Sequence, residues 1–464
     1  MISFSLLPFV ACIAWVLPSC AAWKSTSASS VVLPVAWRNA AAFPSAAPDR
    51  DVARWWASFG DPRMTALIRD ALAGNRDLAS AVARVREARA RRNAERASLF
   101  PALGYSGSVN RSHAETESGG SRNETSYSAG LDASWEPDFF GKNRNSVLAA
   151  SADAATAAEN LNSARASLAS EIALAYIDLR TAEERLAIVR DSLDTREETT
   201  RIASWRAQAG QIDELELEQA RANLESARSS LSSLQQAIDQ TKNNIALLTG
   251  STPGSVSTGR GGIPSPQRRL AVGIPADTVR QRPDVRAAGH AWVAAVARTR
   301  SAEAEQLPSL RLSGTVGVNT LRSSRVFNPE SFTAGVIAGL TGPIFDAGRI
   351  RANIEAQDAA VEQALHAYES IVLTSLSEVE NALIACNRGG ERIATLRRAA
   401  ASAAAAAKLA AQKYEAGVID MTTVLETQRN DLSLRESLAS ANADYAASHI
   451  QLYKALGGGW SAGS

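Results

Sequence analysis

Few residues in this chain have the types and spacing that catalysis or metal binding requires. The three cysteines, Cys12, Cys20 and Cys386, are too widely separated for a disulfide framework or a zinc site. The sequence contains neither a nucleophile elbow nor a phosphate-binding loop. Four histidines are scattered along the chain, at His113, His290, His366 and His449. This pattern predicts no catalytic residue, no metal and no cofactor, and hence a protein that is not an enzyme.

Cys20 is the one residue with an expected chemical role, because it follows an N-terminal export signal. Residues 1–19 are apolar, but the run is too short and too interrupted by proline for a spanning helix. Leu17, Ser19 and Cys20 match a bacterial lipobox, whose cysteine is acylated and becomes the new N-terminus. Pro18 and the lack of a preceding Lys or Arg depart from that motif. The alternative is a plain signal peptide cut near residues 21–22, but we expect lipidation at Cys20 and a tether over residues 20–50.

The charge balance and composition exclude several classes of protein. The 464 residues include 49 Lys plus Arg and 48 Asp plus Glu, giving a net charge of +1. Proteins that bind nucleic acid usually carry a strong basic excess, so we expect no nucleic-acid partner. Hydrophobic residues make up 45%, which excludes a disordered chain. Aromatic residues make up only 6%, and together with frequent alanine they favour long helices with narrow packing seams.

The sequence contains an internal duplication, with corresponding residues of the two copies 207 positions apart. Residues 99–103 recur as 306–310, residues 106–109 as 313–316, and residues 209–213 as 416–420. The predicted domains are a first repeat at 51–250, a second repeat at 276–457 and a C-terminal tail at 458–464. Residues 251–275 between the repeats are rich in Gly, Pro and Ser and are expected to form an irregular linker.

Each repeat is expected to contain a long helical hairpin. No Gly or Pro occurs in the 68 residues between Gly141 and Gly210, or in the 39 residues between Gly417 and Gly457. Hairpins are therefore predicted at 143–249, with a turn at 210–213, and at 349–456, with a turn at 417–420. Gly389 and Gly390 are expected to interrupt the second hairpin. Apolar residues alternate at spacings of four and three, which is typical of coiled-coil seams; these are Leu168, Ile172, Ala175, Leu179, Ala182, Leu186, Val189 and Leu193, then Leu217, Ala220, Leu224, Ala227, Leu231, Leu234 and Ile238.

Two alternating segments precede each hairpin and are predicted to be strands. They span about 103–110, 127–136, 310–319 and 332–341, close to the length that crosses a bilayer as a tilted strand. The connections 111–125 and 320–331 are long and polar, as in outer loops. Four strands cannot close a barrel, and an open edge in lipid would leave backbone groups without partners. The chain must then oligomerise, as a dimer with eight strands or a trimer with twelve; a soluble hairpin packed on helices is the alternative.

Several specific motifs lie within this duplicated frame. They are Trp55-Trp56-Ala57-Ser58-Phe59-Gly60-Asp61-Pro62, Asn75-Arg76-Asp77-Leu78, Arg282-Pro283-Asp284-Val285 and Tyr414-Glu415-Ala416-Gly417. These motifs resemble those of the outer-membrane factors of bacterial efflux systems, the TolC-like channels, and in particular their lipoprotein branch. The resemblance covers about residues 50–457, and one departure is Gly289, where relatives usually have Glu.

The resemblance implies a mixed membrane fold and a passive transport function. A homotrimer would form a twelve-stranded outer-membrane β-barrel continued by a periplasmic α-helical coiled-coil barrel. It would be lipid-anchored in the bacterial outer membrane and contact outer-membrane lipid. It would conduct small molecules from a periplasmic adaptor (membrane fusion protein) and an inner-membrane pump of the resistance-nodulation-division type.

The resemblance also implies roles for particular residues. The turns would form the periplasmic tip, with adaptor contacts at Gly210, Gln211, Gly417 and Val418. The periplasmic gate would follow the second turn, at Thr422, Thr423, Glu426 and Arg429; the alternative is that Glu426 is only a solvated partner of Arg429. An aromatic belt would lie where strands meet helices, at Trp135, Phe139, Phe140 and Phe345.

Three other functions remain open at this point. The channel could be the exit duct of a type I protein secretion system, although the lipobox favours small-molecule efflux. A periplasmic coiled-coil scaffold would have the same helical seams but no channel. An exported enzyme is disfavoured, because the sequence has no nucleophile, metal site or acid–base grouping.

Overall fold

The computed structural model describes residues 31–40, 43, 50–115, 121–259, 261–266 and 275–460. A short 3-10 helix, η3 (Arg50–Phe59), comes before the first repeat's elements, which are α1 (Pro62–Gly74), α2 (Arg76–Ala97), β1 (Ala102–Glu115), β2 (Ser121–Trp135), α3 (Lys142–Gln208) and α4 (Glu214–Leu248). The second repeat consists of α5 (Pro275–Gln281), α6 (Pro283–Ala304), β3 (Ser309–Thr320), η4 (Ser323–Arg325), η5 (Pro329–Ser331), β4 (Phe332–Thr341), α7 (Arg349–Glu415) and α8 (Met421–Ala455).

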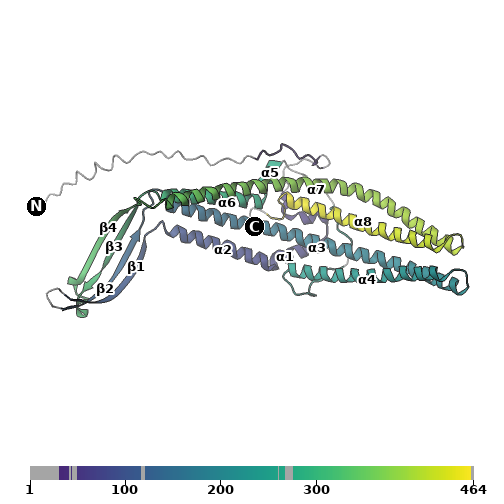
Figure 1. Ribbon diagram of the computed structural model, residues 1–464, viewed down its shortest axis with the longest axis horizontal. Helices are drawn as coiled ribbons and strands as arrows, with labels where there is room; N and C mark the ends of the chain where they lie inside the picture. The colour runs from purple at the N-terminus through teal and green to yellow at the C-terminus, as the bar shows by residue number, and fades with distance from the viewer. Residues whose placement is uncertain are drawn as a thin grey trace. The chain divides into compact units, whose positions relative to one another are not determined.

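The two repeats have helices of equal length at corresponding places. Helices α2 and α6 each have 22 residues, α3 and α7 each have 67, and α4 and α8 each have 35. The strands lie at one end of the helices and the hairpin turns lie at the other (Figure 1). The expected duplicated fold of helix, two strands and long helical hairpin is confirmed.

The hairpin turns are built the same way in both repeats. Gly210 and Gly417 adopt positive φ angles of 69° and 73°, which glycine reaches without steric cost and which end the first helix. Three residues later, Asp213 and Asp420 cap the second helix, and their carboxylates accept hydrogen bonds from the backbone N–H groups of Glu216 and Thr423. Five residues, 209–213 and 416–420, thereby turn each pair of helices back on one another.

The seam positions pack as the spacing predicts. On α3, Ile172 and Leu179 are fully buried, and on α4, Ala220 and Ala227 are 1% exposed. The main apolar core lies where α1, α3, α7 and α8 meet, and it includes Trp55, whose ring stacks on Tyr453 at 5.4 Å. A separate, smaller cluster lies at the tip, formed by Ala203, Ala220, Tyr414, Met421, Val424 and Leu425.

The expectation that Gly389 and Gly390 interrupt the second hairpin is wrong. Helix α7 is continuous from Arg349 to Glu415. A Cβ atom on Gly389 would lie 3.1 Å from Cδ2 of Tyr445 on α8. This glycine therefore provides room for an aromatic ring between two closely packed helices, and the i→i−4 hydrogen bonds of the helix tolerate it.

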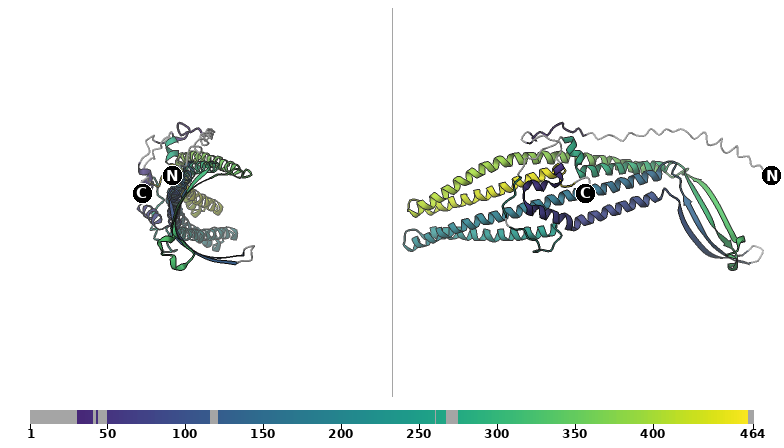
Figure 2. Two further views of the ribbon diagram at one scale, coloured as in Figure 1. Left: turned by 90° about the vertical axis from the view of Figure 1, so that its left-hand side faces the viewer. Right: turned by 180° about the vertical axis from the view of Figure 1, so that it is seen from behind.

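The strands form one antiparallel sheet in the order β1-β2-β3-β4, seen from further sides in Figure 2. Strands β1 and β2 extend beyond the expected segments, because the polar stretch 111–115 pairs with 121–125. Backbone hydrogen bonds form there regardless of side-chain polarity, so this connection is shorter than the sequence indicated.

Between the repeats, Gly130 pairs with Gly317, and a Cβ on Gly317 would lie 2.5 Å from the Ala129 carbonyl oxygen. The two copies thus meet at a glycine pair that permits close backbone approach.

The linker after α4 is fixed to α3 by a buried arginine. Arg180 is 1% exposed, and its guanidinium donates to the carbonyl oxygens of Thr258 and Gly259 at 2.6 and 3.0 Å. It also donates to the Tyr176 hydroxyl and forms an ion pair with Glu183. Both terminal nitrogens of the guanidinium are thus hydrogen-bonded, which compensates the burial of its charge, while its Nε has no partner. The middle of the helical region is thereby tied to the join between the repeats.

Candidate functional site

The sheet has one apolar and one polar face, and the strand register defines both. Leu131 pairs with Val316, and the next pair along is Asp132 with Thr315 on the opposite face. Successive residues of each strand alternate between the two faces, and residues that pair across neighbouring strands share a face. The apolar face carries Leu103, Tyr105, Val109, Leu131, Trp135, Val316, Phe332, Val336 and Leu340, all of them exposed in one chain.

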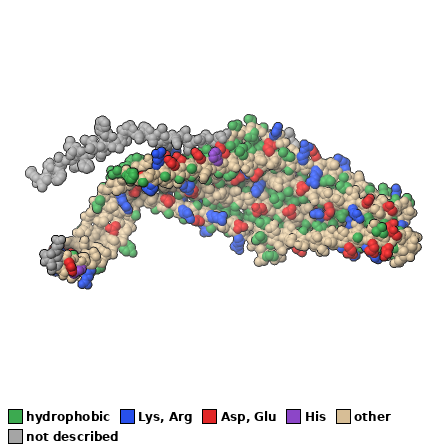
Figure 3. Space-filling model, viewed as in Figure 1, with side chains coloured by type: hydrophobic (Ala, Val, Ile, Leu, Met, Phe, Trp, Pro, Cys, Tyr) green, Lys and Arg blue, Asp and Glu red, His purple; other side chains and the backbone are tan. Residues whose placement is uncertain are grey.

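The opposite face carries mainly small and polar residues, several of which bond to one another, together with the exposed Ile337 of β4. The Ser106 hydroxyl donates to the Asp132 carboxylate at 2.6 Å, and the hydroxyls of Ser108 and Ser128 lie 2.9 Å apart. Few charged side chains lie over the sheet in the view of Figure 3, whereas the helices carry many of both signs. A sheet that is apolar on one side and hydrogen-bonded on the other suits a boundary between lipid and water.

Cysteine labelling tests this assignment of the faces. Leu131→Cys and Val316→Cys are expected to react with lipid-phase maleimides, and their neighbours Asp132→Cys and Thr315→Cys with membrane-impermeant aqueous reagents. The adjacent residues serve as matched controls, because they share strand and depth and differ only in face. The opposite labelling pattern would show that the polar face meets lipid, since a slip of one residue exchanges the faces.

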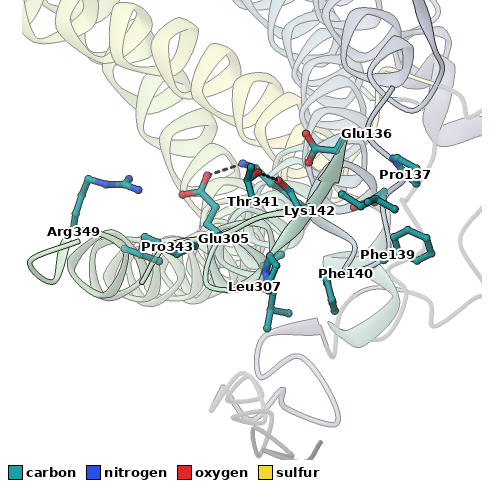
Figure 4. Close-up of a pocket in the computed structure, with 17 residues that line it drawn as sticks. Glu136, Pro137, Phe139, Phe140, Lys142, Glu305, Leu307, Thr341, Pro343 and Arg349 are labelled. Carbon is teal, nitrogen blue, oxygen red and sulfur yellow. Dashed lines mark hydrogen bonds and ion pairs between the residues drawn. The ribbon is translucent and has the colours of Figure 1, made fainter. Parts of the chain in front are cut away.

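The residues expected in an aromatic belt lie at the junction of sheet and helices. Phe139, Phe140 and Phe345 are 65%, 52% and 88% exposed, and Trp135 donates its indole N–H to the Leu99 carbonyl oxygen. A cavity of about 480 Å³ opens at this junction (Figure 4). Phe139 and Phe140 line it, together with an ion pair between Lys142 and Glu305 at 3.2 Å. Aromatic rings beside charged groups are typical of a membrane interface.

The expected gate residues share the exposed side of α8, next to the second hairpin turn. Thr422, Thr423, Glu426 and Arg429 are exposed, while Val424, Leu425 and Gln428 are buried on the other side of the helix. Thr423 also has a capping role, because its N–H and hydroxyl both donate to Asp420, at 2.8 and 2.7 Å. These hydrogen bonds lower the pKa of Asp420.

Glu426 and Arg429 form no ion pair with one another in the described part of a single chain. Arg429 instead lies close enough to the buried Arg196 of α3 to affect it. Burial, followed by the positive charge of Arg429, lowers the pKa of Arg196. The side chains of Glu426 and Arg429 are therefore available to a neighbouring molecule.

A buried polar cluster between α3, α4 and α8 was not anticipated from the sequence. Arg196 donates to the Asn223 carbonyl oxygen at 2.9 Å, and Gln428 donates to the Thr199 hydroxyl at 2.9 Å. Within this cluster, four buried atoms have no hydrogen-bond partner in the described part of the chain: Arg196 Nε, Asn223 Nδ2, Gln428 Oε1 and Asp431 Oδ1. Arg196 is the next seam position after Leu193, so extending the seam by three residues would have found it. This cluster separates the tip's apolar cluster from the main core.

The residues expected to contact an adaptor are exposed at the two hairpin turns. Gly210, Gln211, Gly417 and Val418 all lie at the surface, and Val418 is 69% exposed. Trp205, one helical turn before Gly210, is 58% exposed and was missed. The sequence signal for Trp205 is that it lies outside the seam positions of α3, where an exposed side chain is expected.

The structure brings together one cysteine and one histidine that are distant in sequence. The sulfur of Cys386 lies 3.6 Å from Nδ1 of His449 and 3.3 Å from the Ser448 hydroxyl, all buried between α7 and α8. Burial raises the pKa of Cys386 and lowers that of His449, so both groups are neutral and the thiol is a poor nucleophile. This contact is a packing contact rather than a catalytic pair.

Cys20 lies outside the described residues. Within the described ranges, His, Cys, Asp and Glu form no group of three that could hold a metal ion. None of the helices in the part of the chain that the structure describes combines the length and apolar character needed to cross a bilayer.

Comparison with known proteins identifies the relatives of this chain. A family model described as outer membrane efflux protein matches residues 67–251 and 274–458, which are the two repeats. The cation efflux system protein CusC of Escherichia coli O6:H1 is 30% identical over 459 residues, covering 98% of both chains. The toluene efflux pump outer membrane protein TtgF of Pseudomonas putida is 30% identical over 420 residues, 90% of this chain and 87% of that protein.

Solved structures give the same result for the fold. The outer-membrane channel OprN superposes with a TM-score of 0.87 at 30% identity, over 94% of this chain and 99% of that one. Both repeats, the sheet and the helical hairpins therefore have counterparts in a known channel.

Proposed function

Because the chain belongs to the outer membrane efflux protein family, we propose that three copies of it assemble into a single channel. The protein is an outer-membrane component of an efflux system, and its predicted fold class, function and location in the outer membrane are confirmed. The trimer, the lipid anchor and the identity of its partners go beyond this and are proposed here.

The sheet edges support assembly of several copies. The order β1-β2-β3-β4 leaves β1 and β4 as edge strands, whose outer backbone groups pair with no other strand among the described residues of one chain. In lipid each such group would cost several kcal/mol, so an edge must pair with another chain. Joining β4 of one copy to β1 of the next gives a closed barrel, with twelve strands in a trimer. The apolar face would then meet lipid and the polar face would meet water.

The channel is proposed to conduct passively and to depend on partner proteins for energy. The hairpin turns would contact a periplasmic adaptor through Gly210, Gln211, Gly417 and Val418, with the exposed Trp205 beside them. The energy would come from an inner-membrane pump of the resistance-nodulation-division type. No reaction is assigned to this chain, and the gate is placed at Thr422, Thr423, Glu426 and Arg429.

The observation that carries the channel proposal is the sheet with one apolar and one hydrogen-bonded face at the end of long paired helices. Its test is conductance in planar lipid bilayers with purified, detergent-extracted protein. Discrete single-channel steps are expected, with the same protein added after heat dissociation as a control. Trimers that insert but conduct no current would favour the coiled-coil scaffold. Export of a polypeptide, but not of small molecules, would favour the secretion duct.

A further inference from the structure

The cavity at the junction of sheet and helices lies next to the end of the sheet's apolar face. Trp135 and Leu340 end that face on β2 and β4, and the residues that follow them, Glu136 and Thr341, line the cavity. On β2 the apolar face runs over residues 127–135, close to the 9–11 residues with which a tilted strand crosses the hydrocarbon of a bilayer. The cavity therefore lies at the level of the lipid headgroups.

The wall of the cavity is partly apolar and partly charged (Figure 4). Its apolar part includes Phe139, Phe140 and Leu307. The volume of about 480 Å³ falls within the range of about 300–1,000 Å³ that is usual for small-molecule sites. The charged side chains that line it are Glu136, Asp138, Lys142, Glu305 and Arg349. An occupant of this cavity should therefore be amphipathic.

Three of these charged side chains already have partners. Lys142 pairs with Glu305 at 3.2 Å. The carboxylate of Asp138 accepts hydrogen bonds from the backbone N–H groups of Asn143 and Arg144, and it pairs with the Arg144 guanidinium at 3.2 Å. These groups balance one another and leave little charge for an occupant.

Glu136 and Arg349 are the two charges that remain. Neither forms an ion pair in the part of the chain that the structure describes. Asp346 lies near Arg349, but its carboxylate is engaged by backbone N–H groups at the start of α7. In the view of Figure 4, Glu136 and Arg349 lie on opposite sides of the pair between Lys142 and Glu305. The cavity thus offers one carboxylate and one guanidinium at separate places on its wall.

We propose that this cavity binds the headgroup of a zwitterionic phospholipid of the periplasmic leaflet, with Arg349 at its phosphate and Glu136 at its ammonium group. A guanidinium donates charge-assisted hydrogen bonds to phosphate oxygens, and a carboxylate accepts them from an ammonium group. The rings of Phe139 and Phe140 then contact the apolar part of the lipid. The inference rests on the proposed membrane channel and adds a lipid site to it.

The charges of the wall favour a zwitterion over an anion. Inorganic phosphate or an anionic headgroup would satisfy Arg349 alone and would bring its negative charge close to the carboxylates of Glu136 and Glu305. Like charges that approach in a partly dry site repel more strongly than in bulk water. Phosphatidylethanolamine carries both a phosphate and an ammonium group, so it satisfies both free side chains.

Native mass spectrometry of the full-length trimer in detergent tests the choice of ligand. The purified protein is stripped of lipid, and phosphatidylethanolamine or phosphatidylglycerol is added back at equal concentration. Retention of phosphatidylethanolamine is expected to exceed that of phosphatidylglycerol roughly fivefold. Inorganic phosphate should not displace it. Equal retention of the two lipids, or displacement by phosphate, would overturn the assignment of a zwitterion.

Single substitutions test the two side chains. Arg349→Gln and Glu136→Gln are each expected to lower the retention of phosphatidylethanolamine roughly fivefold, because each removes one charged contact. The matched control is Arg351→Gln, two residues further along α7, where the arginine pairs with Glu355 at 3.3 Å and does not line the cavity. Its retention should equal that of the unmodified protein. An equal loss in this control would overturn the site.

Charge reversal separates a binding role of Glu136 from a structural one. Glu136→Lys places a second free cation in the cavity wall, so its preference is expected to change to phosphatidylglycerol. If Glu136 only supported the local structure, this variant would lose both lipids alike, and that result would overturn its role.

Conductance of the same preparations in planar bilayers separates the lipid site from the proposed channel. Trimers that give discrete current steps but retain no phosphatidylethanolamine would overturn the lipid site and leave the channel intact. Retention by a dissociated subunit but not by the trimer would show that a second copy covers the cavity, and would also overturn the site. Lipid retained by a protein that gives no current would overturn the channel instead.

Discussion

The double variant Glu426→Ala with Arg429→Ala is expected to raise mean single-channel current about tenfold at a given voltage and to admit large antibiotics such as vancomycin to cells. Both side chains are exposed beside the second hairpin turn and make no ion pair with one another in one described chain. Contacts across subunits at the tip would be lost. An exposed pair contributes only about 0.2–1 kcal/mol. Three copies give roughly 1–3 kcal/mol, enough to shift a closed–open equilibrium by about tenfold.

The packing around the tip explains why contacts as weak as those of Glu426 and Arg429 would be enough to hold the entrance closed. The apolar cluster with Val424 and Leu425 is small, and the polar cluster around Arg196 separates it from the main core. Buried groups without hydrogen-bond partners weaken that stretch of helix packing. Because its apolar cluster is small, we expect the tip to move at less cost than the middle of the hairpins.

A second exposed pair provides the matched control for the gate variant. Glu218 and Arg221 lie one turn apart on α4, near the first hairpin turn, and pair at 2.6 Å. Glu218→Ala with Arg221→Ala removes the same charges but should leave conductance within twofold of the unmodified channel. Equal increases in both double variants would mean that any charge loss at the tip opens the channel. Unchanged conductance in an assembled Glu426 and Arg429 variant would place the gate elsewhere.

Cys20→Ser is expected to abolish incorporation of labelled palmitate. Lipid is attached to a lipobox cysteine through a thioether bond that its thiol forms. The serine hydroxyl cannot form that bond. The measurement is radiolabelled or alkyne-tagged palmitate in cells, followed by purification of the chain. Because the barrel itself would hold the protein in lipid, the trimer should persist in the outer membrane without its anchor.

The other two cysteines provide the controls for lipidation. Cys12→Ser changes a thiol within the expected signal, and Cys386→Ser changes a buried one. Both variants should incorporate palmitate at the level of the unmodified protein. Label that persists in Cys20→Ser would refute the lipobox assignment and favour a plain signal peptide.

Local sequence patterns were sufficient to predict the helices, the strands and the internal duplication. The seam from Leu168 to Leu193 predicted a long helix because a heptad pattern depends only on residues close in sequence. Strand parity around Leu131 and Val316 was readable for the same reason. The family motifs then supplied the trimer and the gate as expectations, since no local pattern distinguishes a dimer of eight strands from a trimer of twelve.

Contacts between residues distant in sequence were decided only by the tertiary structure. Gly389 does not break α7, because Tyr445 of α8 fills the space that a side chain would occupy. Arg429 lies near Arg196 rather than in a pair with Glu426, because α8 packs on α3. Local periodicities of 3.5 and 2 were enough to define the apolar and polar surfaces of each helix and strand. The fold determined which surfaces meet, because packing and hydrogen bonding select among partners that no periodicity can rank.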